Sequence, residues 1–268
     1  MTYSRSTCAF SLEGRVALIT GGGRGIGAAI ARGFAEAGAA VAVIARTTAE
    51  IDRLAAEIEA EGGRAFACTG DVNDLGALPA VVDRTVGALG GLDILVNNAG
   101  GGDEWRPFLD TTVAQLEAAF HFNVSVPFEL SRLSVPHLLE RPGASIINMS
   151  SIALLKSARG HIVYDAAKGA LHSITRSMAA DLGPRIRVNA IMPGATETPA
   201  LRELLDTRAP AMREQLIDRT RLRRLCAPAD IANTAVFLAS DAASFITGKY
   251  IEVDGGPVDE ISQRFPDL

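Results

Sequence analysis

Cysteine, histidine and long apolar runs are all scarce in this sequence. Its 268 residues include three cysteines (Cys8, Cys68 and Cys226) and four histidines, and none of them has the spacing of metal ligands. We therefore expect no disulfide framework and no metal site. No apolar stretch approaches the roughly 18 residues of a membrane span. The N-terminus, "MTYSRSTCAFSLEGR", also lacks the apolar core of a signal peptide. These absences predict a reduced, cytoplasmic protein that neither crosses nor binds a membrane.

The chain also lacks an excess of positive charge. Its net charge is −5 and its pI is about 5.5, which argues against nucleic acid as a partner. Hydrophobic residues make up 48% of the chain, enough to bury one large core. Because no linker, internal repeat or low-complexity segment interrupts the sequence, we expect a single domain over residues 1–268.

Short apolar runs alternate with longer helical patterns along the chain. "RVALIT" (15–20) and "AVAVIA" (40–45) are continuously apolar, as in strands covered on both faces. Further strands are expected around 65–72, 93–100, 145–150, 186–194 and 249–256, and helices around 27–38, 47–63, 75–90, 112–139, 164–183 and 228–239. Thr47 and Glu50 form a possible capping box for the second helix. The alternation predicts an α/β fold: a doubly wound, Rossmann-like parallel sheet of about seven strands with helices on both faces.

A glycine-rich turn, "TGGGRGIG" (20–27), lies between the first strand and the first helix. Its glycines, Gly21, Gly25 and Gly27, depart from the commoner G-x-G-x-x-G spacing, and the turn lacks the GK[ST] of a P-loop. Alone it would indicate an ordinary βα turn as readily as a ligand site. At the first βα junction of a doubly wound sheet, it predicts a dinucleotide site with pyrophosphate at the helix N-terminus.

The end of the second strand bears on which dinucleotide binds. NAD-binding domains often carry a carboxylate there for the ribose 2′-hydroxyl, whereas this strand ends in Ala45, followed by Arg46. Arg46, with Arg24 from the glycine turn, would suit a 2′-phosphate. We therefore favour NADP(H), with NAD(H) as the alternative. Both arginines would otherwise be solvated surface charges.

Five segments in order resemble the short-chain dehydrogenase/reductase family over about residues 12–256. They are "TGGGRGIG", "DILVNNAG" (93–100), Ser151, "YDAAK" (164–168) and "NAIMPGATET" (189–198). The resemblance implies that Asp71 and Val72 flank the adenine, that 98–100 support the cofactor, and that Thr198 bonds the carboxamide. The full expected cofactor-binding set is Gly21, Arg24, Gly25, Ile26, Gly27, Arg46, Asp71, Val72, Asn98, Ala99, Gly100, Tyr164, Lys168, Pro193, Gly194, Thr196 and Thr198.

Residue types indicate the catalytic chemistry. Reducing a ketone requires a proton for the developing alkoxide, and the Tyr164 hydroxyl can donate it. Lys168, four residues later on the same helical face, would lower the pKa of that hydroxyl. Ser151, at a strand end, would hold the carbonyl oxygen, whereas its neighbour Ser150 would face the opposite side. The family resemblance implies that Asn123 anchors a water linking Lys168 to solvent.

Three segments are expected to line the substrate end of the site: 101–108, 152–163 and 195–226, the last as a mobile lid. Six apolar residues there suit a hydrophobic ketone or alcohol: Leu154, Leu155, Ile162, Leu201, Leu204 and Leu205. His161 lies in the second segment, although a lone histidine is more often structural.

The sequence thus predicts an NAD(P)-dependent oxidoreductase that interconverts a ketone or aldehyde and a secondary alcohol. Its substrate is expected to be a small apolar molecule, such as a steroid-like or other hydrophobic carbonyl compound. It is similar to both bacterial hydroxysteroid dehydrogenases and β-ketoacyl carrier-protein reductases. The cluster Arg219, Arg221, Arg223 and Arg224 would either dock an acidic carrier protein or form a solvated lid face. A non-catalytic nucleotide sensor is disfavoured because Ser151, Tyr164 and Lys168 are all present.

The same resemblance implies a homo-oligomer. Family members usually form tetramers through the helices near 112–139 and 164–182 and through the C-terminal strand. In such an assembly the tail "VDEISQRFPDL" (258–268) would lie near a neighbouring subunit's site.

Overall fold

The computed structural model describes residues 9–102, 105–156, 158–207 and 210–257, so Cys8 and the tail 258–268 lie outside the described residues. Seven parallel strands form one sheet in the order β3-β2-β1-β4-β5-β6-β7. The strands are β1 (Val16–Thr20), β2 (Ala40–Ala45), β3 (Arg64–Thr69), β4 (Ile94–Asn97), β5 (Ala144–Met149), β6 (Ile186–Pro193) and β7 (Tyr250–Val253). The expected doubly wound parallel sheet is confirmed.

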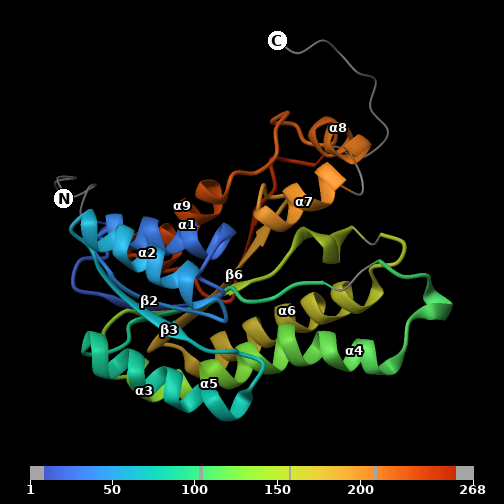
Figure 1. Ribbon diagram of the computed structural model, residues 1–268. Coiled ribbons are helices and arrows are strands. Elements are labelled where there is room, and N and C mark those ends of the chain that lie inside the picture. The colour runs from blue at the N-terminus through green and yellow to red at the C-terminus, as the bar shows by residue number, and fades with distance from the viewer. Residues whose placement is uncertain (1–8, 103–104, 157, 208–209, 258–268) are drawn as a thin grey trace.

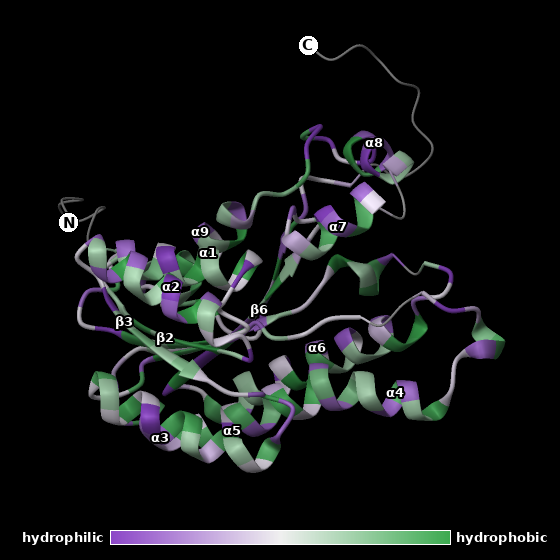
Figure 2. Cartoon of the chain, in the orientation of Figure 1, coloured by the Kyte–Doolittle hydropathy of each residue, from purple (hydrophilic) through white to green (hydrophobic). Residues whose placement is uncertain are grey.

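Helices cover both faces of this sheet (Figure 1). One layer contains α1 (Gly25–Glu36), α2 (Thr48–Ala60) and α9 (Pro228–Ala239), and the other contains α3 (Leu78–Leu89), α5 (Val126–Leu138) and α6 (Ile162–Leu182). The α4 helix (Val113–Phe120) packs beside α6. Figure 2 shows apolar strands running between helices whose outer faces are more polar.

The β1 strand shows how a continuous apolar run serves two cores. Ala17 and Ile19 pack with α1 and α9, whereas Val16 and Leu18 pack on the opposite face with α3 and α5. All four side chains are buried because successive residues of a strand point to opposite faces.

The helix expected at 112–139 is not continuous. A π-helical turn, η3 (His121–Ser125), separates α4 from α5. Pro127 follows this turn and lacks the N–H that an α-helix would use to bond the Asn123 carbonyl. Turns of this type often occur at functional sites. Here the turn contains Asn123, which is 1% exposed.

The capping box expected from Thr47 and Glu50 is wrong. Thr47 precedes α2, but its side chain makes no capping hydrogen bond. Glu50 instead extends towards the glycine turn, where a Cβ on Gly23 would lie 2.9 Å from its Oε2 atom. The space left by a missing side chain is thus filled by a carboxylate from α2.

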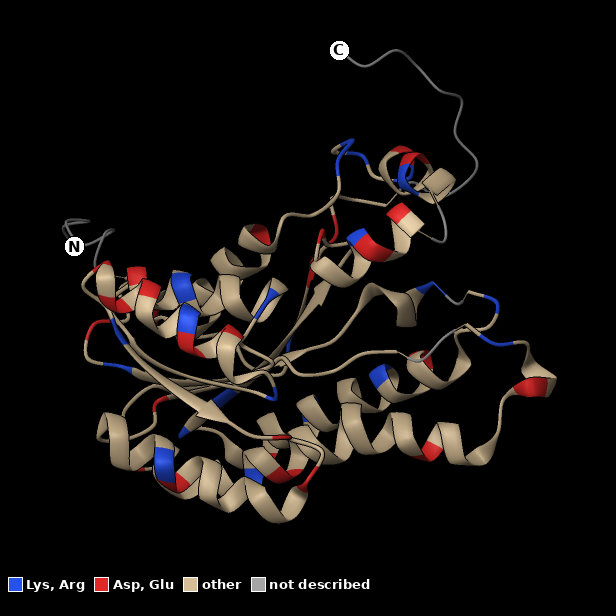
Figure 3. Cartoon of the chain, viewed as in Figure 1, with Lys and Arg blue, Asp and Glu red and all other residues tan. Residues whose placement is uncertain are grey.

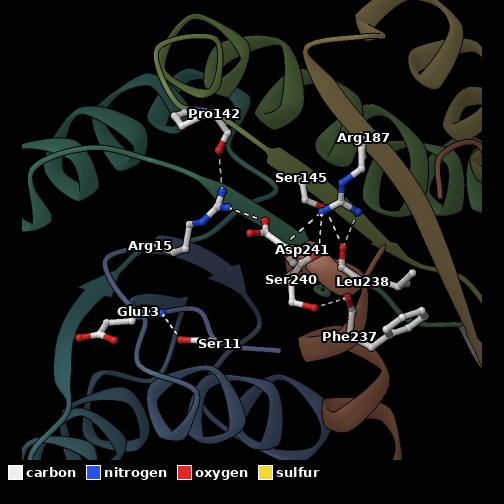
Figure 4. A network of polar contacts seen from close by, with 11 residues as sticks. Ser11, Glu13, Arg15, Pro142, Ser145, Arg187, Phe237, Leu238, Ser240 and Asp241 are labelled. Atoms are coloured by element: carbon white, nitrogen blue, oxygen red, sulfur yellow. Dashed lines mark hydrogen bonds and ion pairs between the residues drawn. The ribbon is translucent and has the colours of Figure 1, made fainter. Parts of the chain in front are cut away.

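The amino ends of the central strands are held by two arginines (Figure 4). The Arg15 guanidinium donates to the Pro142 carbonyl at 2.7 Å and to Asp241 at 3.0 Å. Arg187, on β6, donates to the Leu238 carbonyl at the C-terminal end of α9. A cation suits the negative end of a helix dipole. These contacts fasten the edge opposite the carboxyl ends of the strands.

The segment after β6 forms two short helices, α7 (Pro199–Thr207) and α8 (Pro210–Asp218), before the chain returns to α9. They lie over the carboxyl ends of the strands, above the segments that follow β4 and β5 (Figure 1). This is the position expected of the lid. In the described ranges, no helix is both long and apolar enough to cross a bilayer.

Candidate active site

A groove of about 410 Å³ opens at the carboxyl ends of β1, β2 and β4. Twelve of the expected cofactor-binding residues line it: Gly21, Arg24, Gly25, Ile26, Gly27, Arg46, Asp71, Val72, Asn98, Ala99, Gly100 and Thr198. The sheet order reverses between β1 and β4, and ligands of open α/β sheets bind at such a switch point.

The glycine spacing follows from close contacts within the turn. A Cβ on Gly27 would lie 2.3 Å from the Gly21 carbonyl oxygen and 2.6 Å from Asn98 Nδ2. Gly21 and Gly25 have φ angles of +64° and +57°, which favour glycine. The turn is therefore held close to the start of α1, and its backbone remains open to a phosphate group.

Thr20 and Asn98 connect this turn to β4. The Thr20 hydroxyl accepts hydrogen bonds from the main-chain N–H groups of Asn98 and Ala99 at 2.9 and 2.8 Å. The Asn98 side chain donates in return to the carbonyl oxygens of Thr20 and Gly21. These bonds fix the two walls of the groove relative to each other.

Lys168 does not line the groove but is buried next to Gly100, which does. Its ammonium donates to the Met149 carbonyl at 2.8 Å, and the side chain is only 4% exposed. Burial lowers the pKa of Lys168 to about 8 because the charged form loses its hydration.

Gly100 connects Lys168 to the groove. A Cβ there would lie 3.1 Å from the Lys168 Nζ atom and 2.9 Å from the Asn123 Oδ1 atom. A dinucleotide fits this arrangement, because the absence of a side chain at Gly100 lets the ammonium approach the main chain that lines the groove.

The Asn123 side chain is used to hold the chain after β4. Its Nδ2 atom donates to the carbonyls of Gly101 and Ala119 at 2.9 and 3.0 Å, and its Oδ1 atom accepts from Gly101 N–H at 3.1 Å. Asn123 thus lies beside Gly100 and Lys168, as expected. Its implied link to a water stays a prediction.

Tyr164 and Ser151 lie together, but the expected effect of Lys168 on Tyr164 is wrong. Burial raises the pKa of Tyr164, a hydrogen bond with the Ser151 side chain opposes this rise, and the Asp165 charge adds to it. The Lys168 ammonium is turned to the Met149 carbonyl and lies 5.5 Å from the centre of the Tyr164 ring. Tyr164 therefore keeps its proton at neutral pH.

The two neighbouring serines have different surroundings. Ser151 begins the 3₁₀ turn η4 (Ile152–Leu155), and its Oγ atom accepts from Ala153 N–H at 3.1 Å. The Ser150 side chain is buried, and its Oγ atom has no partner among the described residues. Contact with Tyr164 favours Ser151, in agreement with the sequence expectation.

The residues after β6 divide into two groups. Thr198 reaches the glycine turn, where its Cγ2 atom would lie 3.3 Å from a Cβ on Gly25. Pro193, Gly194 and Thr196 lie outside the groove, and the buried Thr196 hydroxyl donates to the Gly194 carbonyl at 3.0 Å. They support the segment from which Thr198 extends.

The six apolar residues expected in the substrate pocket are not equivalent. Leu155 and Ile162 are exposed, whereas Leu205 is 1% exposed and packs into the protein. Leu154, Leu201 and Leu204 are partly buried. The exposed members lie on the segments before and at the start of α6.

Sequence reasoning missed several residues of the groove. Thr20 does not line the groove but bonds the main chain after β4, and it could have been found as the polar end of the buried run "RVALIT". Glu50, Asn73, Phe122 and Pro199 line the groove itself, but no local pattern in the sequence distinguishes them.

Comparison with known proteins identifies the family. A family model described as enoyl-(acyl carrier protein) reductase matches residues 21–257. The 7α-hydroxysteroid dehydrogenase of Escherichia coli K12 is 40% identical over 252 residues, which cover 94% of this chain and 97% of that protein. The chain belongs to the short-chain dehydrogenase/reductase family. An uncharacterized oxidoreductase of Mycobacterium tuberculosis is 46% identical over 248 residues, 92% of this chain and 93% of that protein.

Solved structures of this family have the same fold as this chain. A 7α-hydroxysteroid dehydrogenase in complex with NADH and 7-oxo glycochenodeoxycholic acid has a TM-score of 0.89 at 40% identity, covering 95% of this chain and 98% of that one. A candidate NAD(P)-dependent gluconate 5-dehydrogenase from Beutenbergia cavernae, with NADP bound, has a TM-score of 0.85 at 34% identity, with coverages of 92% and 98%. This short-chain dehydrogenase/reductase is therefore an NAD(P)-dependent oxidoreductase.

Burial of Lys168 predicts a cost in stability. Lys168→Met should raise the free energy of unfolding near pH 7 by up to roughly 3 kcal/mol, because the folded chain binds this proton less tightly than the unfolded one. Between about pH 8 and 10.5 the unfolded lysine keeps its proton and the folded one loses it. As the pH rises through this range, the free energy of unfolding of wild type therefore increases and approaches that of Lys168→Met. Urea denaturation at neutral and alkaline pH measures this.

The exposed Lys249 provides a matched control. Lys249→Met should leave unfolding nearly unchanged at each pH. A loss of stability in Lys168→Met that does not vary with pH would contradict the assigned cost of burial.

Proposed function

We propose that this protein interconverts a hydrophobic ketone and the corresponding secondary alcohol, with a steroid-like or other ring-containing molecule as substrate. The observation that carries the proposal is the contact between the Ser151 and Tyr164 side chains, next to the buried Lys168. The chain's 40% identity to a 7α-hydroxysteroid dehydrogenase, over nearly its whole length, supports the substrate class.

The residues of the site suit reduction of a carbonyl group. Ser151 would donate a hydrogen bond to the carbonyl oxygen, and Tyr164 would give that oxygen its proton as the alkoxide develops. When bound, a nicotinamide dinucleotide supplies the hydride. The Lys168 ammonium, buried next to Gly100, would bond a cofactor ribose. Asn123 holds Gly101 and so keeps this wall in position.

We also propose NADP(H) as the preferred cofactor. Arg24 and Arg46 are exposed on the groove wall, and the end of β2 carries no carboxylate. The Glu50 carboxylate lines the same groove and would suit an unphosphorylated ribose. The competition between Arg46 and Glu50 is therefore what sets the preference.

A carrier-protein substrate is the second candidate, and it depends on the arginine cluster at 219–224. Arg224 pairs with Asp230, and Arg223 lies 3.8 Å from Asp218. Figure 3 shows acidic and basic residues interspersed over α7 and α8, whereas the turn that follows them is basic. Cations that already pair with carboxylates attract an acidic partner only weakly. This favours a small-molecule substrate over a carrier-protein substrate.

Three further features are proposed for this chain. The segment 195–226 acts as a lid over the substrate, and one domain comprises the whole chain. The protein forms a homotetramer through the faces of α4, α5, α6 and β7. Val113, Leu116 and Phe128 support this, because all three are large, apolar and exposed on α4 and α5. Light scattering on the purified protein tests the assembly.

Removal of the Tyr164 hydroxyl tests the function. With NADPH, Tyr164→Phe should lower kcat at least ~100-fold on any ketone that wild type reduces, because the proton donor is lost. Absorbance of NADPH follows turnover, and a panel of a steroid ketone, an aryl ketone and an acyl thioester ranks the candidates. Binding of NADPH should persist.

Tyr250→Phe is the matched control, because its hydroxyl bonds the His172 carbonyl away from the groove. It should keep nearly full activity. If wild type binds NADPH tightly but reduces no carbonyl compound, the protein is a nucleotide sensor. Substantial activity in Tyr164→Phe would reject the proton-donor role.

Substitution of Arg46 tests the cofactor preference. Arg46→Ala should lower kcat/KM for NADPH roughly tenfold or more, as a charge-assisted contact is lost, and should change the value for NADH little. Arg53→Ala is the control, since Arg53 pairs with Glu57 on the same helix. A wild-type preference for NADH would overturn the proposal.

A further inference from the structure

The Tyr164 ring is enclosed by groups outside the proposed catalytic set. Gly102 lies against it, since a Cβ on this glycine would approach the Tyr164 Cδ2 atom to 3.2 Å. The His161 ring lies on it with the two ring centres 4.8 Å apart and an angle of 42° between their planes. The ring that carries the reacting hydroxyl is thus supported by the segments before and within α6 and after β4.

His161 is itself held from two directions. Its Nδ1 atom lies 2.9 Å from the Asp165 Oδ1 atom, one helical turn further along α6. The side chains of His161 and Asp165 are 17% and 15% exposed, so this hydrogen bond is largely shielded from water. The bond fixes the rotation of the imidazole ring and leaves its faces to the neighbouring aromatic groups.

Trp105 occupies the outer side of this imidazole. The centres of the Trp105 and His161 rings are 5.2 Å apart, with an angle of 36° between their planes. Trp105, His161 and Tyr164 thus form a row of three rings, here called the aromatic row. It leads from the reacting hydroxyl to the surface, where Trp105 is 56% exposed.

The main chain fastens the two segments that carry this row. Arg106 N–H donates to the Gly160 carbonyl at 3.0 Å. Gly160 has a φ of +80°, and a Cβ there would lie 3.0 Å from the Arg106 carbonyl oxygen. The contact between Trp105 and His161 is therefore built into the backbone of both segments rather than left to two mobile side chains.

An exposed indole at the end of such a row requires an explanation. A tryptophan offers a large, rigid apolar face at low entropic cost, and aromatic faces prefer flat partners in offset or tilted contact. Leu155 and Ile162, both exposed, lie on the segment before α6 and at its first residue. The segments flanking Tyr164 thus carry an apolar surface that is flat at Trp105.

We propose that Trp105 determines substrate specificity by stacking on a flat fused-ring ketone, with His161 as the positioning residue that holds Trp105 in register with Tyr164. This rests on the proposed carbonyl reductase function and deepens it. A flexible acyclic ketone presents no flat face, so it gains little from the indole.

Substrate binding can be followed without turnover because Trp105 is the chain's one tryptophan. With oxidised cofactor present, α-tetralone should quench the intrinsic fluorescence saturably, whereas methyl octyl ketone, of equal carbon number, should quench it far less. Equal quenching by both ketones, or none by α-tetralone, would overturn the proposal. Tyr164→Phe should retain the quenching, so failure of the catalytic assignment and failure of this inference give different results.

Steady-state kinetics give the second test. Trp105→Ala should lower the ratio of kcat/KM for α-tetralone to kcat/KM for methyl octyl ketone about tenfold, with most of the loss in KM. Phe245→Ala removes an exposed aromatic group outside the three segments expected to line the substrate end and should leave the ratio unchanged. An unchanged ratio in Trp105→Ala would reject the specificity role.

Variants of His161 separate positioning from general stability. His161→Ala should lower the same ratio, and His161→Phe, which keeps a ring between Trp105 and Tyr164, should restore most of it. If His161 is merely structural, both variants will reduce turnover of the two ketones equally and leave the ratio as in wild type.

Discussion

The site depends on the reciprocal hydrogen bonding between Thr20 at the end of β1 and Asn98 after β4. Parallel strands leave their carboxyl ends open, and the chain diverges in opposite directions from these two neighbours. Without a tie, the glycine turn and the segment after β4 would each be a flexible wall. The Thr20 hydroxyl accepts hydrogen bonds from two N–H groups, and the Asn98 side chain donates to two carbonyls. These bonds hold the two walls of the groove together.

The same edge of the sheet contains a buried charge that destabilises the folded protein. Lys168 is buried with one carbonyl partner, and its ammonium is positioned by Gly100 and Met149 rather than by a carboxylate. A carboxylate would stabilise the charge more effectively, but it would also repel a phenolate at Tyr164. The site therefore keeps a buried cation that is directed to a carbonyl, and burial lowers its pKa.

Much of the fold could be predicted from the sequence, for reasons that vary with the element. Strand β2 and helix α9 match their expected bounds, because an apolar run bounded by turns and a proline-initiated helix are local signals. The π turn at Asn123 and the course of Glu50 were missed, since both depend on contacts with distant segments. The twelve expected residues that line the groove include five from the glycine turn, whereas Pro193, Gly194 and Thr196 do not line it.

The pKa of Tyr164 shows why spacing alone does not determine chemistry. An i,i+4 pair on a helix shares a face, and from this we expected the lysine to lower the pKa of the tyrosine. In the structure the Lys168 ammonium is directed to the Met149 carbonyl. The charge that acts on the pKa of Tyr164 is that of Asp165, which raises it. Asp165 is also the residue that orients His161. One carboxylate thus adds to the rise in the pKa of Tyr164, of which burial is the largest cause, and also orients the imidazole of the aromatic row.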